Sequence, residues 1–246
     1  NPAQFLRLSK QLQPWLAAAS VLLIGAGLYF ALLVSPADYQ QGQTVRIMYV
    51  HVPSAWLGMV GYSTMALASA VGLIWKHPLA DLVAKAAAPI GASFTFLCLA
   101  TGSLWGKPMW GTWWAWDARL TSMLILLFLY LGYMALQSAF DDPSRGARAS
   151  AILALAGFIN VPVIKFSVDW WKTLHQPASL LKVSGPAIHP AMLTPLLLMV
   201  TGFTCFFVVV LLIRVRSEII ASKIRAIRLT QIHGTREEPL ADHAVG

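Results

Sequence analysis

The sequence predicts an all-α integral membrane protein, a single polytopic domain of residues 1–246 in which six transmembrane helices form a bundle. Hydrophobic residues occupy 57% of the positions and the mean hydropathy is +0.65, both above the values of soluble domains. A helix needs about 20 apolar residues to cross roughly 30 Å of hydrocarbon. Six segments are candidates: 15–34, 48–75, 86–104, 120–140, 149–164 and 191–213.

The first and fifth segments, and the residues that follow the last, need separate comment. Segment 15–34 is longer than the apolar region of a signal peptide and no small-x-small cleavage motif follows it, so we expect it to remain as the first helix. Segment 149–164 is the shortest of the six. Residues 214–246 are mostly polar, and we expect them to form a cytoplasmic tail containing a surface helix that frays.

Lysine and arginine are distributed unequally between the two sides of the predicted bundle. Twelve lie in the two tails and in connections 76–85 and 141–148. Six lie in connections 35–47, 105–119 and 165–190: Arg46, Lys107, Arg119, Lys165, Lys172 and Lys182. By the positive-inside rule both termini are cytoplasmic and the second set of connections faces outward. The net charge of +8 is therefore not gathered into the single patch that nucleic-acid binding needs.

Several function classes are disfavoured by what the sequence lacks. No ionisable residue lies near the middle of a predicted span, where pumps and transporters place such groups. There is no GxxxxGK[ST] motif for ATP phosphates, and no CxxCH motif for covalent haem attachment. Cys98 and Cys205 both fall inside predicted spans, which argues against a disulfide framework.

Tryptophan is concentrated in the outer connections, which hold seven of the ten: Trp105, Trp110, Trp113, Trp114, Trp116, Trp170 and Trp171. An interfacial aromatic belt is one explanation, although a belt is expected on both sides. If residues 110–117 form a helix, one arc of about 100° carries Trp110, Trp113, Trp114 and Asp117, with Trp116 turned away. Such an arc forms a platform for a flat, apolar ligand. On this segment alone, belt and platform remain open alternatives.

Three of the six histidines lie on the predicted outer side: His51, His175 and His189. One histidine near a helix end usually has a structural role. Two histidines beside an aromatic platform instead suit axial ligation of haem iron, and we expect His51 and His175 to be these ligands. His189 precedes Pro190 and is more typical of a helix start.

Two arginines and one aspartate complete the predicted site. Guanidinium groups pair with carboxylates in a planar, bidentate manner, so Arg46 and Arg119 are candidates for binding the two haem propionates. Asp117 is expected to orient an arginine or a backbone amide rather than to bind iron.

Three motifs carry a resemblance to a known family: MYVHVPSAW, WGTWWAWDARLTS and SVDWWKTLHQP. Together they resemble the tryptophan-rich haem-handling membrane proteins, specifically the family of cytochrome c maturation protein C, the haem exporter C proteins of the bacterial inner membrane. The likeness extends over nearly the whole chain in length, span count and motif order. It implies that His51 and His175 are axial ligands, that 110–117 is the haem-binding segment, and that Arg46 and Arg119 take part in haem handling.

The resemblance also implies a function and a set of partners. A member of this family gathers non-covalently bound haem b at the periplasmic surface and presents it to a periplasmic haem chaperone, cytochrome c maturation protein E. The implied associates are ATP-binding transporter subunits A and B and a small membrane protein D of the same system. The chain would position haem without acting as an enzyme.

Two alternatives remain at this stage. A transmembrane b-type cytochrome exchanging electrons with quinol would also bind haem through histidines, although it usually buries them well inside the helices. A haem porter or channel subunit, with the tryptophans only a belt, would need ionisable groups that the predicted spans lack.

Overall fold

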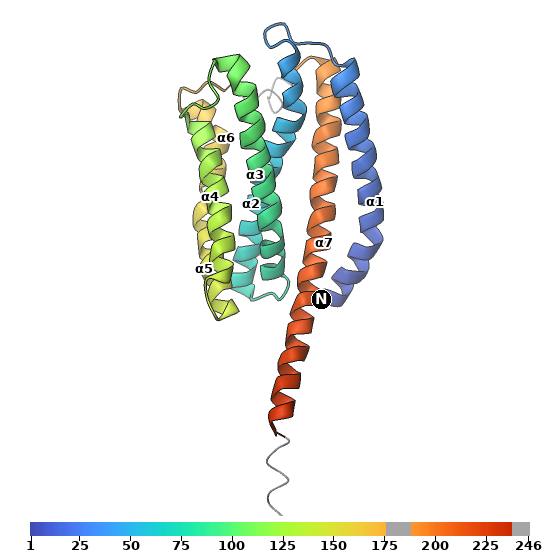
Figure 1. Cartoon of the computed structure of the whole chain (residues 1–246), viewed down its shortest axis with the longest axis vertical. Coiled ribbons are helices and arrows are strands. Elements are labelled where there is room, and N and C mark those ends of the chain that lie inside the picture. The colour runs from blue at the N-terminus through green and yellow to red at the C-terminus, as the bar shows by residue number, and fades with distance from the viewer. Residues whose placement is uncertain (176–187, 238–246) are drawn as a thin grey trace, which may run out of the picture.

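The computed structural model describes residues 1–175 and 188–237, and within these ranges the chain is almost entirely helical (Figure 1). Six of its helical segments are long and apolar enough to cross a membrane, which confirms the predicted helical fold. The helical segments are α1 (Pro2–Tyr29), η1 (Phe30–Val34), η2 (Gln43–Ile47), α2 (Met48–Trp75), α3 (Ala80–Trp110), α4 (Ala118–Ser138), α5 (Pro143–Gly157), α6 (Asn160–Trp170) and α7 (Pro190–Glu237).

The first span begins well before the predicted residue 15. The Asn1 side chain accepts a hydrogen bond from the amide of Ala3, and Pro2 occupies the first turn, where its missing N–H is no loss. The polar residues that follow therefore join α1. At its other end, α1 continues as the π-helical turn η1.

The fifth span consists of two helices rather than one. α5 ends at Gly157, and α6 begins at Asn160 after a short break. Together they cover Pro143–Trp170, which is longer than the predicted 149–164 and sufficient to cross a membrane.

The last span does not end near Ile213. α7 continues without interruption to Glu237, so the part of the predicted tail that the structure describes is helical. Residues 238–246 of that tail lie outside the described ranges, as do residues 176–187 of connection 165–190, including Lys182.

The helices form three groups that lie side by side. α2 and α3 are central, α4, α5 and α6 cover one side, and α1 pairs with α7 on the other (Figure 1). α2 and α3 approach closely because Gly61 faces Gly91: a Cβ added at Gly61 would lie 2.9 Å from the Cα of Gly91. Tyr62 and Tyr130 pack edge-to-face beside this crossing.

The described parts of all three predicted outer connections lie at the same end of the bundle, which we call the outer end. In Figure 1 it is the upper end, where the chain passes from η1 to α2, from α3 to α4, and out of α6. Residues far apart in the sequence are therefore brought to one height, and the candidate site lies there.

Candidate functional site

His51 lies in the first turns of α2 and faces α3. Its Nδ1 atom is 3.1 Å from the carbonyl oxygen of Cys98 and 3.1 Å from Oγ1 of Thr101. Gly102 leaves room for the ring, since a Cβ there would lie 2.9 Å from Cε1 of His51. The imidazole is thus held in one orientation by a single turn of α3.

These contacts determine which ring nitrogen of His51 carries the proton. The Cys98 carbonyl can only accept a hydrogen bond, and the Thr101 hydroxyl already donates to the carbonyl oxygen of Leu97 at 2.7 Å. Nδ1 must therefore be the donor to both. In the neutral ring Nε2 then keeps its lone pair, the state that a metal ligand requires.

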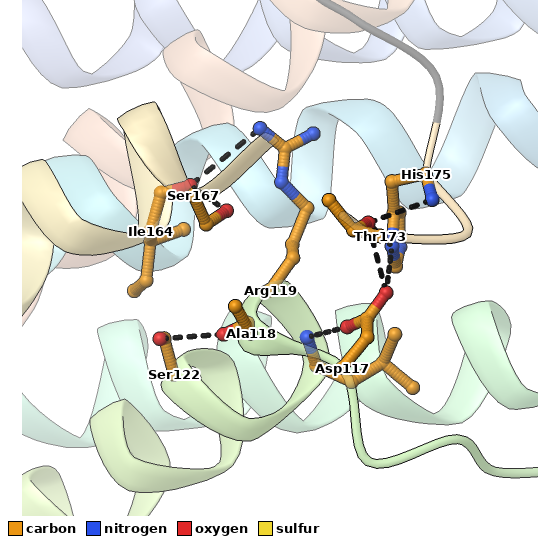
Figure 2. Close-up of polar contacts among 9 residues, drawn as sticks. Asp117, Ala118, Arg119, Ser122, Ile164, Ser167, Thr173 and His175 are labelled. Carbon is orange, nitrogen blue, oxygen red and sulfur yellow. Dashed lines mark hydrogen bonds and ion pairs between the residues drawn. The ribbon is translucent and has the colours of Figure 1, made fainter. Parts of the chain in front are cut away.

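His175 is held by a different set of contacts, shown in Figure 2. Its Nδ1 atom lies 2.9 Å from Oδ2 of Asp117, which also accepts a 3.0 Å hydrogen bond from the hydroxyl of Thr173. The Thr173 oxygen in turn accepts from the backbone amide of His175 at 2.8 Å. A carboxylate that accepts from Nδ1–H leaves Nε2 as the free nitrogen, as in carboxylate–histidine–metal arrangements.

Asp117 connects this network to the start of α4. Its Oδ1 atom accepts a 2.8 Å hydrogen bond from the backbone amide of Leu120 and so caps the helix. Burial raises the pKa of the Asp117 carboxyl, but hydrogen bonds from Leu120, His175 and Thr173 outweigh this and lower the pKa overall. For His175, burial lowers the pKa and the Asp117 hydrogen bond only partly opposes it. The lowered pKa favours the neutral form of His175 at pH 7.

Each of the two histidines lies beside an aromatic ring. Trp105 contacts His51 edge-on with ring centres 5.6 Å apart, and Trp110 contacts His175 in the same manner at 5.0 Å. Within the described part of the chain, no hydrogen bond reaches Nε2 of either histidine.

The helix that would have placed residues 110–117 on one arc does not form. α3 ends at Trp110, where Gly111 adopts a positive φ of 74°, and residues 111–117 are not helical because α4 starts only after its Asp117 cap. The rings therefore do not share a helical arc. Trp113 is exposed, with the Lys107 ammonium 5.9 Å from its ring centre, and Trp114 instead contacts Trp116.

Both candidate arginines donate to backbone carbonyl groups. Arg46 donates to the carbonyls of Leu32 and Ser35, where η1 ends, which places its positive charge at a helix C-terminus. Arg119 points away from Asp117 toward α6, where Nη2 lies 3.5 Å and 3.4 Å from the carbonyl oxygens of Ile164 and Lys165 (Figure 2).

Three buried donors at the outer end have no acceptor among the described residues. They are Nε of Arg46, Nε of Arg119 and Nε1 of Trp114. A buried N–H without a partner costs about 1–3 kcal/mol, so each would gain from an acceptor supplied by a ligand. Propionate oxygens are acceptors of the required kind, and the residues present therefore fit a haem.

The sequence matches one protein family over most of its length. A family model described as Heme exporter protein C covers residues 1–230. The chain belongs to the Heme exporter protein C family. Heme exporter protein C of Bradyrhizobium diazoefficiens is 58% identical over 231 residues, covering 94% of this chain and 88% of the relative. The Escherichia coli K12 protein of that name is 51% identical over 207 residues, which cover 84% of this chain and 83% of the relative. The Haemophilus influenzae protein is 50% identical over 220 residues, which cover 89% of this chain and 89% of the relative.

Membership of the Heme exporter protein C family defines the broad role of the chain. Proteins of this family handle haem for cytochrome c biogenesis and are membrane transport components rather than enzymes. The six membrane-spanning helices agree with this role. The chain is thus a multi-pass membrane protein that handles haem.

Four residues of this Heme exporter protein C family member were not predicted as part of the site. Cys98, Thr101 and Gly102 position His51, while Thr173 joins Asp117 to His175. The spacing of Cys98, Thr101 and Gly102 puts them on one turn of α3, but only the crossing of α2 and α3 shows which histidine they meet. Of the four, only Thr173 could have been predicted from the local sequence, because a threonine two positions before His175 can accept a hydrogen bond from its backbone amide.

Proposed function

We propose that this chain binds haem b between His51 and His175 at the outer end of the bundle and presents it to a periplasmic chaperone. One observation carries the proposal: each histidine engages an oxygen acceptor through Nδ1, which leaves both Nε2 lone pairs available for iron. Two imidazoles that each keep a free Nε2 would be able to supply two nitrogen ligands to the iron of one haem.

The surroundings of the histidines suit the rest of the haem. Trp105 and Trp110 supply apolar ring edges next to the two imidazoles. Arg46, Arg119 and Trp114 carry the unpaired donors that propionates would satisfy. In this proposal Trp113 and Trp116, which are exposed, lie at the surface from which haem is handed on.

The cellular setting is proposed from the charge distribution and from the family. Lysine and arginine predominate on the side of the two termini, so we place the chain in a bacterial inner membrane with both termini cytoplasmic and the histidines periplasmic. The chaperone would be cytochrome c maturation protein E. Subunits A and B of an ATP-driven transporter and small membrane protein D would be the other partners, and the relatives' name, heme exporter, fits such an assembly.

The chain contributes binding and orientation in this role. His51 and His175 hold the iron, and the cap at Asp117 fixes His175 relative to α4. The reactive edge of a haem held this way faces a partner in one defined orientation, which raises the rate of a reaction without an acid or base from this chain.

Absorption spectra of the purified protein in detergent test the two ligands. We expect a low-spin haem spectrum with a sharp α band, which His51→Ala and His175→Ala each weaken or convert to high spin. His189→Ala is the matched control, because Nδ1 of His189 accepts from the amide of Ala191 and so caps α7. Spectra that stay unchanged in both ligand variants would remove His51 and His175 as axial ligands.

A further inference from the structure

The end of α7 leaves the bundle and projects beyond it. Ile219 is buried, with 3% of its surface exposed, whereas the positions from Ile220 to Arg228 are exposed. The helix continues to Glu237, about 27 Å further at 1.5 Å per residue. Figure 1 shows this segment running past the other helices, at the end of the bundle opposite the outer end. We call it the α7 extension.

One face of the α7 extension carries isoleucines. Ile220, Ile224 and Ile227 are 49%, 46% and 59% exposed, and their spacing of four and three residues places them in one line. We call this line the isoleucine stripe. With 100° per residue, Lys223 and Arg228 lie about 70° to either side of it. An apolar line with a cation on either side is a pattern typical of a helix that binds in a groove.

The α7 extension has little to stabilise it by itself. The sequence has no Asp or Glu from Ile219 to Arg236, so ion pairs between successive turns are absent there. Isolated helices of this length are marginal in water. The helix direction is nevertheless set by the bundle, because Lys85 pairs with Glu218 at 2.8 Å and Arg216 donates to Gln13 at 2.9 Å just before the extension.

We propose that the isoleucine stripe docks into a groove of a partner protein whose floor is apolar and whose rims carry Asp and Glu side chains. The partner lies on the side of the membrane opposite the histidines. The proposal rests on the stripe and its flanking charges, independently of haem binding. Acidic rims would complement Lys223 and Arg228, steering the partner and fixing its register.

Two other occupants fit the geometry less well. A helix that binds a membrane surface lies in the plane of that surface, but the α7 extension continues the direction of a membrane-crossing helix. A second copy of this chain would bring Lys223, Arg225 and Arg228 against their own equivalents, and like charges disfavour such a contact.

Photocrosslinking of the full-length protein in the membranes of its own cells tests the proposal. A benzoylphenylalanine replaces Ile224 in the stripe or, as the matched control, Ser222, which is exposed on the opposite face of the same turn. We expect position 224 to give one protein adduct, whose crosslinked peptide lies in an apolar groove bordered by Asp or Glu. Position 222 should give at least about tenfold less.

Charge substitutions in the protein that carries benzoylphenylalanine at position 224 test the proposed acidic rims of the partner groove. Lys223→Glu together with Arg228→Glu should lower the yield at position 224 by about tenfold, whereas Lys223→Arg with Arg228→Lys should retain it. Membrane insertion and the gel-filtration profile should be unchanged in all variants. Adducts with lipid or with a second copy of the chain, equal yields at both positions, no adduct at either, or no effect of charge reversal would each overturn the proposal.

Discussion

Asp117 and His175 are 58 positions apart, yet Oδ2 of the aspartate and Nδ1 of the histidine lie 2.9 Å apart. The same aspartate caps α4 through its other oxygen. His175, the last residue of the first described range, is therefore tied to the N-cap of the membrane-spanning helix α4. Together with the contact between the Trp110 and His175 rings, this hydrogen bond connects the tryptophan-rich segment to the proposed iron ligand.

Asp117→Asn separates the two roles of this residue. Asparagine caps helices as well as aspartate, so α4 should remain intact. The amide cannot support the His175 imidazole as a carboxylate does, and we expect haem affinity to fall about 10–100-fold in a titration followed by the Soret band. Asp141→Asn, at the exposed opposite end of the bundle, is the control and should bind haem normally. Equal affinities in the two variants would exclude Asp117 as a support for His175.

Gly102→Ala should disturb His51 without a change of any ligand. The added Cβ would lie 2.9 Å from Cε1 of His51, so the ring must rotate away from Cys98 and Thr101. We expect about tenfold weaker haem binding and a partly high-spin spectrum. Gly25→Ala is the matched helical control, because nothing lies within 4 Å of its added Cβ. A normal low-spin spectrum in Gly102→Ala would show that the ring position observed here is not needed for ligation.

Trp114→Phe should change stability and haem affinity in opposite directions. The substitution keeps an aromatic ring and removes Nε1–H, a buried donor without an acceptor among the described residues. We expect the haem-free protein to gain about 1 kcal/mol in unfolding free energy and the haem complex to weaken about five- to tenfold. Thermal unfolding and haem titration measure the two effects. Trp116→Phe, at a side chain 78% exposed, should alter neither.

The titration of His175 should reflect its burial. Burial lowers the pKa of His175 below its usual 6.5, while the hydrogen bond to Asp117 raises it in part. The unfolded chain therefore binds more protons than the folded chain just below pH 6.5, so folded-state stability is complete above that pH and decreases as the pH falls. NMR titration of ¹⁵N-labelled histidine should give a pKa below 6.5 that Asp117→Asn lowers further. A pKa above 6.5 would mean that the carboxylate dominates over burial.

The helical bundle could be predicted from the sequence because the membrane makes length and hydropathy decisive. Segments 48–75 and 191–213 were recognisable from apolar composition alone. The ends of the helices were harder to predict, because polar residues also belong to them. The polar residues at the start of α1 are helical because Asn1 caps that helix, and those after Ile213 are helical because α7 continues through them.

The residue types of the candidate site were also predictable, but their contacts were not. His51 and His175 could be recognised in the sequence because both lie on the predicted outer side, where the tryptophans are concentrated. Whether residues 110–117 are helical depends on the positive φ of Gly111 and on the cap at Asp117, which the tryptophan spacing does not reveal. The contact of His51 with Thr101 depends on the crossing of two helices and has no local signal.

α7 has a mechanical consequence for the two ends of the protein. Its 48 residues form one rod of about 72 Å, more than twice the thickness of the hydrocarbon layer. His189 caps its outer end, and the connection from His175 leads into it. A tilt of about 5° about one end of such a rod displaces the other by about 6 Å. A force applied to the α7 extension on one side of the membrane would therefore move the other end of α7, where His189 caps the helix.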